Sequence, residues 1–468
     1  MQLDRSAKLG TGSVPRLLLE FSLPAIVGMV AQGLYNFVDR MFVGKALDEN
    51  GIAGVTVALP YMLVSMGLGM LVGFGAAALV SIRLGERKRD EAEQVLGSAT
   101  ALLVGASLAL SGLGLLLLDP ILKASGASQS ILPYARDYLW IIVAGTVFQA
   151  VSFGLNAVVR AEGNPWTAMI AMLLSVLLNV LLAPLFLFVF QWGMQGAALA
   201  TVLSQAAMAV WVLAYFLSRR SLLRLRRRNL RVHWPVCARI LAIGSPPCLM
   251  QVVAAMLNSL LNHQLATYGG DRAISVMGII YAIVMMIFMP IFGINQGMQP
   301  IVGYNYGALQ YRRVTHALLL AMLAATAIAL TGFTIAMLCP APVARLFSRH
   351  DNQALVADAV HAMRICFVMV PVLGFQIVGA GYFLAVGKPK QGMLLSLSRQ
   401  VLVLIPAVAV LPLFFGLNGV WAALPTADLT SAVLTGAWLL AELRHLDRRH
   451  METNGVGTGV EVSTEGVA

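Results

Sequence analysis

The sequence contains few charged residues. Asp, Glu, Lys and Arg make up 11% of its 468 residues, whereas hydrophobic residues make up 59%. Soluble domains carry roughly 25% charged residues, so this chain has too few charges to cover a surface that faces water. The net charge of +11 does not indicate nucleic-acid binding, because the basic residues lie mostly in short loops between apolar runs. That distribution is typical of the cytoplasmic loops of membrane proteins.

The sequence also lacks motifs for catalysis and for metal or nucleotide binding. It has no Walker A motif, so ATP-driven transport by this chain is not expected. No cluster of His, Cys and Asp has the spacing of metal ligands. The four cysteines are scattered without a CxxC pair, and we interpret them as packing residues. The sequence therefore predicts a protein that is not an enzyme and that has no metal site and no cofactor.

The sequence has long apolar runs, such as residues 99–118 and 317–338. Each can cross a bilayer core, which takes about 20 residues, and a helix satisfies its own backbone hydrogen bonds in lipid. These runs predict an all-α integral membrane protein with about twelve transmembrane helices. The expected spans are residues 21–43, 52–82, 95–118, 132–158, 166–190, 193–217, 240–267, 274–304, 314–338, 363–386, 393–415 and 418–440.

Basic residues mark alternate loops and so indicate the orientation. The segment 219–239 holds eight arginines and no acid, whereas Lys45 is followed by Asp48 and Glu49. Because loops rich in Lys and Arg stay in the cytoplasm, we expect both termini to be cytoplasmic and the protein to lie in the bacterial inner membrane. The tail 451–468 is rich in Gly, Thr and Val without a period, and we expect it to be disordered.

An internal duplication divides the chain. Gly75 and Gly85 recur as Gly297 and Gly307, and residues 161–165 recur as 385–389, at offsets of 222 to 224. A constant offset is the signature of a repeat. The repeat predicts two pseudo-symmetric six-helix lobes, related by an axis along the membrane normal. We expect an N-lobe at 1–218, a basic cytoplasmic linker at 219–239 and a C-lobe at 240–450.

Four stretches carry a resemblance to a known family. They are residues 35–44 (YNFVDRMFVG), 160–165 (RAEGNP), 297–307 (GMQPIVGYNYG) and 416–421 (GLNGVW). With them, residues 15–445 resemble the multidrug and toxic compound extrusion (MATE) family, nearest the bacterial branch of DinF-like and MepA-like exporters. The resemblance implies a secondary active antiporter that exports amphipathic organic cations in exchange for H⁺ or Na⁺. We expect small organic cations and the lipid bilayer as its partners, no nucleic acid, and a monomer.

Asp39 is the first candidate for binding the coupling ion. It shares one face of its expected helix with Gln32, Tyr35 and Asn36, at the i, i+3, i+4 and i+7 spacing. A polar stripe on an apolar helix is expected to face a cavity. A carboxylate removed from water takes up a proton at a higher pH than one in water, and the family resemblance supports a role here. Alternatively, Asp39 lies at the outer interface and pairs with a basic neighbour.

Other polar residues in the expected spans are candidates for lining a substrate cavity, or for interhelical hydrogen bonds worth about 0.6 kcal/mol on average. The candidates for lining the cavity include the three residues that share a helix face with Asp39. The full set is Gln32, Tyr35, Asn36, Gln149, Asn156, Asn179, Asn295 and Gln299. Some relatives carry an acid four residues after an Asn in the fifth helix, where this chain has Ala183. Others carry acids in the seventh and tenth helices, where it has Gln251 and Gln376. Their coupling schemes therefore do not transfer whole.

Arg399 and Asp428 are expected to form an ion pair. Arg399 lies about 13 Å from the inner face on the eleventh helix, and Asp428 about 14 Å from it on the twelfth. One alternative is a fixed structural pair. The other is a pair that opens during ion coupling when Asp428 binds a proton or a substrate competes for it. A neighbouring guanidinium stabilises the charged carboxylate, which favours the fixed pair.

Two other functions have to be weighed. A flippase of lipid-linked oligosaccharide precursors shares the broader architecture, but it needs a cationic cavity to hold pyrophosphate. Beyond Arg399, few basic residues lie deep in the expected spans, which disfavours this alternative. A membrane-embedded enzyme or structural subunit lacks a catalytic cluster, and the duplication fits alternating access better.

The topology can be tested by labelling. In a variant without its native cysteines, single cysteines placed at Arg226 and Asp271 should react with an impermeant reagent from opposite sides of the membrane, because positively charged loops stay in the cytoplasm. Reaction of both from outside intact cells would contradict the assignment.

Overall fold

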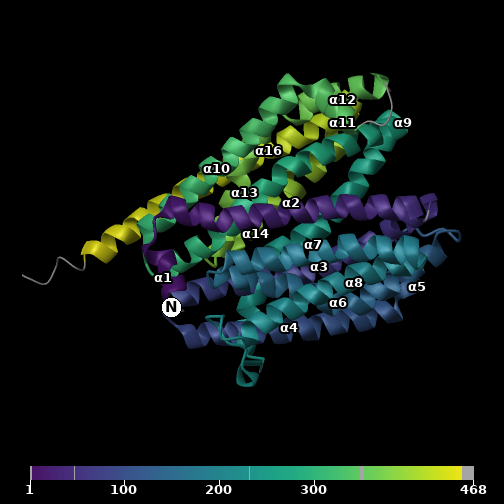
Figure 1. Cartoon of the computed structure of the whole chain (residues 1–468). Helices are drawn as coiled ribbons and strands as arrows, with labels where there is room; N and C mark the ends of the chain where they lie inside the picture. Colours follow the sequence, from purple (N-terminus) through teal and green to yellow (C-terminus); the bar gives the residue numbers. More distant parts are fainter. Residues whose placement is uncertain (1–2, 47, 231, 348–352, 456–468) are drawn as a thin grey trace, which may run out of the picture.

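The computed structural model describes residues 3–46, 48–230, 232–347 and 353–455, and these residues contain helices but no strand (Figure 1). The first half contains α1 (Leu3–Thr11), α2 (Val14–Ala46), α3 (Asp48–Gly85), α4 (Arg89–Leu116), α5 (Leu118–Ala124), α6 (Leu132–Ala161), α7 (Pro165–Pro184), η1 (Leu185–Val189) and α8 (Gly193–Leu217). After η2 (Arg227–Leu230), the second half contains α9 (Trp234–Gly307), α10 (Tyr311–Leu338), α11 (Pro340–Phe347), α12 (Gln353–Cys366), α13 (Val370–Ala385), α14 (Pro389–Leu397), η3 (Ser398–Leu404), α15 (Ile405–Phe415) and α16 (Leu417–Gly455).

Within these described ranges, nine helices are long and apolar enough to cross a membrane. One of them, α9, has 74 residues and is about 110 Å long at 1.5 Å per residue, far more than one crossing needs. Gly270, at φ 63° and ψ −165°, interrupts its helical geometry and divides it into two crossings. The bent pair α12 and α13 adds one more candidate span, and the expected all-α membrane fold is confirmed.

Several boundaries differ from those expected. Helix α9 begins at Trp234, inside the expected linker. The expected span 363–386 is broken between α12 and α13 by a 54° bend, because Pro371 opens a new helix. Helix α16 continues to Gly455, so the start of the expected disordered tail is helical. Residues 441–451 are mostly strong helix formers, which extend a helix into water, and residues 456–468 lie outside the described ranges.

Each half has its own apolar core, and each core contains the start of the other half's first helix. Val14, Leu17 and Phe21 of α2 pack with residues of α9 to α16. Ile240 and Ile243 of α9 pack in turn with residues of α3 to α8. The division at residue 218 therefore separates the repeats in sequence, while the first helix of each repeat starts in the opposite lobe.

The segments that precede these two helices dock on the same lobes. In the linker, the Ser221 hydroxyl donates to Glu162 Oε2 at 2.8 Å, and Arg226 Nε lies 3.6 Å from Glu93 Oε2. Both acids are buried in the first half. On the second half, Arg313 Nη2 donates to the carbonyl oxygens of Leu9 and Gly12 at 3.2 and 2.6 Å and so anchors the end of α1. The basic linker is therefore a docked strap.

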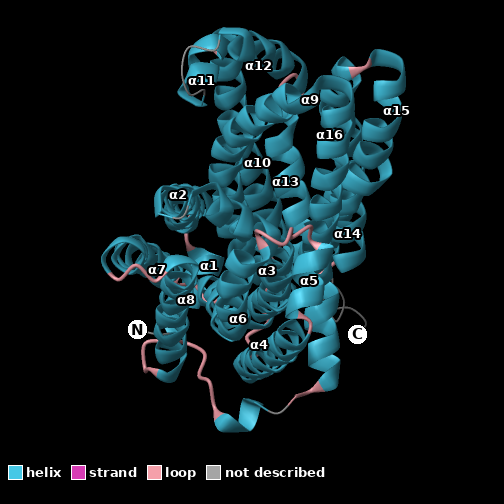
Figure 2. Ribbon diagram, turned by 90° about the vertical axis from the view of Figure 1, so that its right-hand side faces the viewer, coloured by secondary structure: helices cyan, strands magenta, loops and turns pink. Residues whose placement is uncertain are grey.

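The halves touch most closely at the end where α1 lies. A Cβ added at Gly85 would stand 2.0 Å from the Tyr304 carbonyl oxygen, and one at Gly307 would stand 2.1 Å from that of Ile82. Adding the repeat offset of 222 to Gly85 and Ile82 gives Gly307 and Tyr304, so each contact is the repeat equivalent of the other. The two contacts therefore lie about the pseudo-twofold axis that relates the halves. Small residues allow such backbone approach between membrane helices. The halves spread apart toward the opposite end, where α10–α12 diverge from α4–α8 in Figure 1; Figure 2 views the molecule from that end.

This contact predicts a difference between two glycines of α9. Gly307→Ala should lower the free energy of unfolding by about 1–3 kcal/mol, because the new methyl group meets the backbone of α3. Gly278→Ala is the matched control, since nothing lies within 4 Å of its added Cβ. Thermal unfolding of the purified variants measures both, and equal midpoints would contradict the close contact.

Candidate functional site

Three helices of the first half meet in a polar cluster around Tyr35. Asn179 of α7 lies with its Nδ2 atom 3.4 Å from the Tyr35 hydroxyl and 3.3 Å from the Thr201 hydroxyl on α8. Asp39, one turn beyond Tyr35 on α2, is an electrostatic neighbour of that tyrosine. Its Oδ1 atom is shielded from solvent. The cluster therefore places a carboxylate, an amide and two hydroxyls in an apolar bundle.

Other positions in this half show why Asp39 stands out. Ala183, where some relatives keep an acid, is fully buried in a small apolar cluster with Phe186. Asp137 is exposed near the start of α6. Gln32 is partly buried on α2, and the side chain of Asn36 lies outside the described part of the chain. Beside the cluster, η1 is a π-helix that follows Pro184, and π-helical turns often occur at functional sites.

The polar residues of α6 are engaged within the first half. Gln149 Oε1 accepts a hydrogen bond from the Ser65 hydroxyl at 2.6 Å. The Asn156 amide donates to the Ala168 carbonyl oxygen at 2.9 Å, and its Oδ1 accepts a hydrogen bond from Arg160. In this structure Gln149 therefore ties α6 to α3, and Asn156 ties it to α7.

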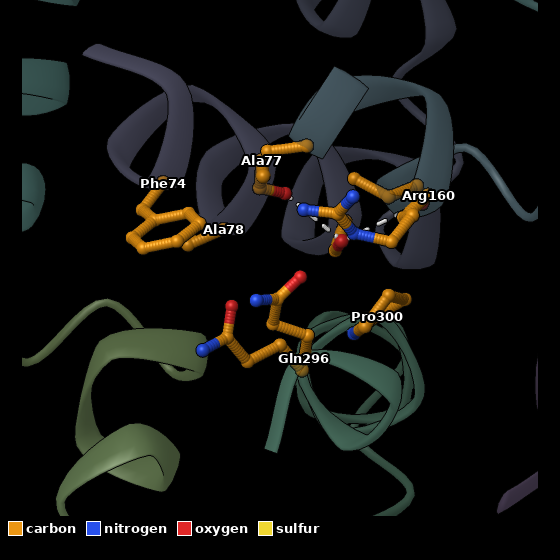
Figure 3. A pocket seen from close by; sticks show the side chains of 10 residues that line it. Phe74, Ala77, Ala78, Arg160, Gln296 and Pro300 are labelled. Carbon is orange, nitrogen blue, oxygen red and sulfur yellow. Dashed lines mark hydrogen bonds between the residues drawn. The ribbon is translucent and has the colours of Figure 1, made fainter. Parts of the chain in front are cut away.

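The two candidates on α9 face different neighbours. Asn295 is buried and lies against Gly381 of α13, in the interior of the second half. Gln299 lines a small cavity between the halves, together with Gln296 and Arg160 (Figure 3). This cavity has a volume of about 10 Å³, roughly the space that one water molecule needs. Among the residues predicted to line a substrate cavity, Gln299 thus lies at the boundary between the lobes, at the end where the lobes are in contact.

The second half contains the pair expected from matched depth. Arg399 Nε donates to Asp428 Oδ1 at 2.7 Å, and the Asp428 side chain is 4% exposed. Arg399 lies in the π-helix η3, which separates α14 from α15. Nearby, Gln376 donates to the Ser431 hydroxyl, one turn beyond Asp428 on α16. The contact between the two charges is confirmed, and its role in transport stays a prediction.

Some contributors to these clusters were not predicted as site residues. Thr201 completes the cluster of Tyr35, and its signal was present, because Thr201, Ser204 and Gln205 form a stripe at i, i+3 and i+4 on α8. The buried carboxylates of Glu93 and Glu162 had no such signal. They lie next to loops, where acids are normally solvated, and the docked linker contacts both of them.

The order of the helices, the repeat and these clusters can be compared with known proteins. The MatE family model matches residues 24–185 and 246–409, one stretch in each half. The chain belongs to the MatE family. The two matched stretches correspond to the two repeats, so the family model supports the duplication seen in sequence.

Relatives of this MatE protein include named exporters. It is 27% identical over 439 residues to the multidrug export protein MepA of Staphylococcus aureus, covering 92% of this chain and 95% of MepA. It is 40% identical to the MATE multidrug transporter DinF-BH, solved in complex with rhodamine 6G, with a TM-score of 0.87 and coverage of 94% and 98%. A MATE transporter solved in an outward-facing conformation, 24% identical, gives a TM-score of 0.89 with coverage of 94% and 98% and shares the fold.

The buried pair predicts non-additive mutations. Arg399→Gln and Asp428→Asn should each destabilise the protein by about 3–5 kcal/mol, because each leaves an uncompensated charge in the second half. The double variant should lose less than the sum of the two, since it leaves no charge behind. A double-mutant cycle on unfolding midpoints measures the coupling, and strict additivity would show that the pair contributes nothing.

Proposed function

We propose that this MatE protein is a secondary active efflux transporter that exchanges amphipathic organic cations for H⁺ or Na⁺ by alternating access. The observation that carries the proposal is the cluster of Asp39, Tyr35, Asn179 and Thr201, which joins α2, α7 and α8. A carboxylate held among apolar helices is costly unless it serves ion or substrate binding. It is the group that a proton, a sodium ion and an organic cation can all compete for.

The exchange follows from that competition. The halves are in contact at the end where α1 and the basic linker lie, and they are apart at the opposite end. In this conformation Asp39 meets ions from the outside. A proton or Na⁺ that binds there neutralises the carboxylate and weakens its attraction for a bound organic cation, which leaves. The hydroxyl and amide groups of Tyr35 and Asn179 are available to hydrogen-bond either form. After the lobes rock, loss of the ion to the cytoplasm restores the negative charge and the next cation binds.

The relatives support this choice of cargo. DinF-BH, 40% identical, is named a multidrug transporter and was solved with rhodamine 6G, and MepA is named a multidrug export protein. Because position 183 is an alanine here and not an acid, Asp39 is the carboxylate of the described cluster. In this proposal that one acid binds both the ion and the substrate. The same proposal places the protein in the cytoplasmic membrane of a bacterium, with both termini inside and with no catalytic reaction of its own.

A flippase is less well supported by the second half. The deep arginine that could attract pyrophosphate, Arg399, is paired with Asp428 at 2.7 Å and is therefore neutralised. A lipid-linked oligosaccharide also needs an open cationic surface, whereas Arg160 lies 7% exposed at the closed end between the halves. Export of rhodamine 6G from an efflux-deficient bacterium that expresses this chain would separate the two functions.

Asp39→Asn tests the coupling site directly. In proteoliposomes with an imposed H⁺ or Na⁺ gradient, the wild type should move rhodamine 6G with one of the two, and Asp39→Asn should fall to the rate of empty liposomes. The amide has the same shape but cannot exchange a proton or a charge. Asp137→Asn, which removes an exposed acid of α6, is the matched control and should keep the rate. Full transport by Asp39→Asn would overturn the assignment.

A further inference from the structure

Arg160 is a buried cation whose charge the fold does not balance. Arg160 lies near the end of α6 and is 7% exposed. One of its nitrogens, Nη1, donates to Asn156 Oδ1. Among the residues that the structure describes, no carboxylate lies within 4.0 Å of its guanidinium, although other arginines, such as Arg272 and Arg399, have such partners. A buried charge without a counter-charge is strongly unfavourable, so a second charge is expected beside it.

The repeat shows that the architecture does not need this arginine. Residues 161–165 correspond to 385–389, so the position of Arg160 is occupied by Leu384 in the second half. Leu384 is the last residue but one of α13, as Arg160 is of α6, and a glycine turn follows each helix. Since an apolar side chain closes the same helix in the same fold, Arg160 has another reason to be there.

The cavity beside Arg160 offers hydrogen-bond donors from both halves. Gln296 and Gln299 of α9 stand across it from the guanidinium, as Figure 3 shows for Arg160 and Gln296. Gln296 Nε2 also donates to Met29 Sδ at 3.3 Å, which leaves one of its two N–H groups for a ligand. The Ser81 hydroxyl, also in its wall, donates to the Ala77 carbonyl oxygen at 2.9 Å. The remaining lining residues are apolar: Phe74, Ala77, Ala78, Ala157, Ala161 and Pro300. The wall thus has a fixed positive charge, two amides and no acid, which suits an anion.

We propose that a single small monovalent anion of the size of chloride binds between Arg160, Gln296 and Gln299. The cavity volume of about 10 Å³ is close to that of one water molecule and excludes organic anions, so only a small ion is proposed here. Its donors come from α6 and from α9, so the site is complete only while the basic ends of the halves are in contact. The bound anion therefore favours that conformation over one open to the cytoplasm.

Bromide serves as the probe, because it resembles chloride and can be located by anomalous scattering. Purified full-length protein in detergent is titrated with sodium bromide in place of sodium gluconate, at constant ionic strength. The unfolding midpoint of the wild type should rise and saturate, since a ligand that binds the folded state stabilises it. Arg160→Leu, which installs the residue of the second repeat, should lose this rise. Arg219→Leu, which removes an exposed arginine of the linker, should keep it.

A second variant and a direct view of the ion complete the test. Gln299→Leu keeps the guanidinium and removes one donor, so the half-saturating bromide concentration should rise severalfold even if Arg160→Leu fails to fold. Crystals grown in bromide should show an anomalous peak beside Arg160. A wild type that does not respond to bromide, an equal response in Gln299→Leu and Arg219→Leu, or peaks on the outer surface alone, meaning an adventitious ion only, would each overturn the proposal.

Discussion

The two halves of this transporter meet backbone to backbone where Gly85 lies against Tyr304 and Gly307 lies against Ile82. Without a hydrophobic driving force between helices in lipid, such close packing is a main source of helix association. The contact lies at one end of both lobes, so it closes that end and lets the other spread. Arg160 lies between the halves near this contact, whereas Asp39 lies near the far end of α2.

Four charged side chains within the helices are treated in three different ways. Arg399 and Asp428 neutralise each other inside the second half. Asp39 is an electrostatic neighbour of Tyr35, whose hydroxyl lies in a polar cluster with Asn179 and Thr201. Arg160 faces a small cavity between the halves. Because a charge in a bilayer is costly, the first arrangement is suited to stability, whereas the other two are the positions at which we propose that ions bind.

The first helix of each repeat links the two lobes. Helix α2 starts in the core of the second half and α9 starts in that of the first. The segments ahead of them are anchored on the same lobes, by Arg313 on α1 and by Glu162 on the linker. The proposed rocking of the lobes would therefore bend or carry these two helices. The break at Gly270 and the prolines within α2 and α9 supply points at which they can yield.

The sequence by itself determined the class of protein and indicated the duplication. Apolar runs of about 20 residues have one stable outcome in lipid, and the offset of 222 to 224 relates positions whether or not they touch. It also brought Arg399 and Asp428 together, because depth along two consecutive antiparallel helices is simple arithmetic. The stripe at Asp39 was visible for the same reason, since helical periodicity is local.

Only the tertiary structure decided which surfaces meet. Nothing in the pattern of Val14, Leu17 and Phe21 says that they are buried in the opposite lobe, because hydrophobicity specifies burial and not a partner. Asn156 and Arg160 share a helical face in sequence, but the packing turned Asn156 to α7 and left Arg160 facing α9. Glu93 and Glu162 became buried when the linker folded back on them. Contacts between distant segments depend on the shape of the whole molecule, and a local pattern does not contain that shape.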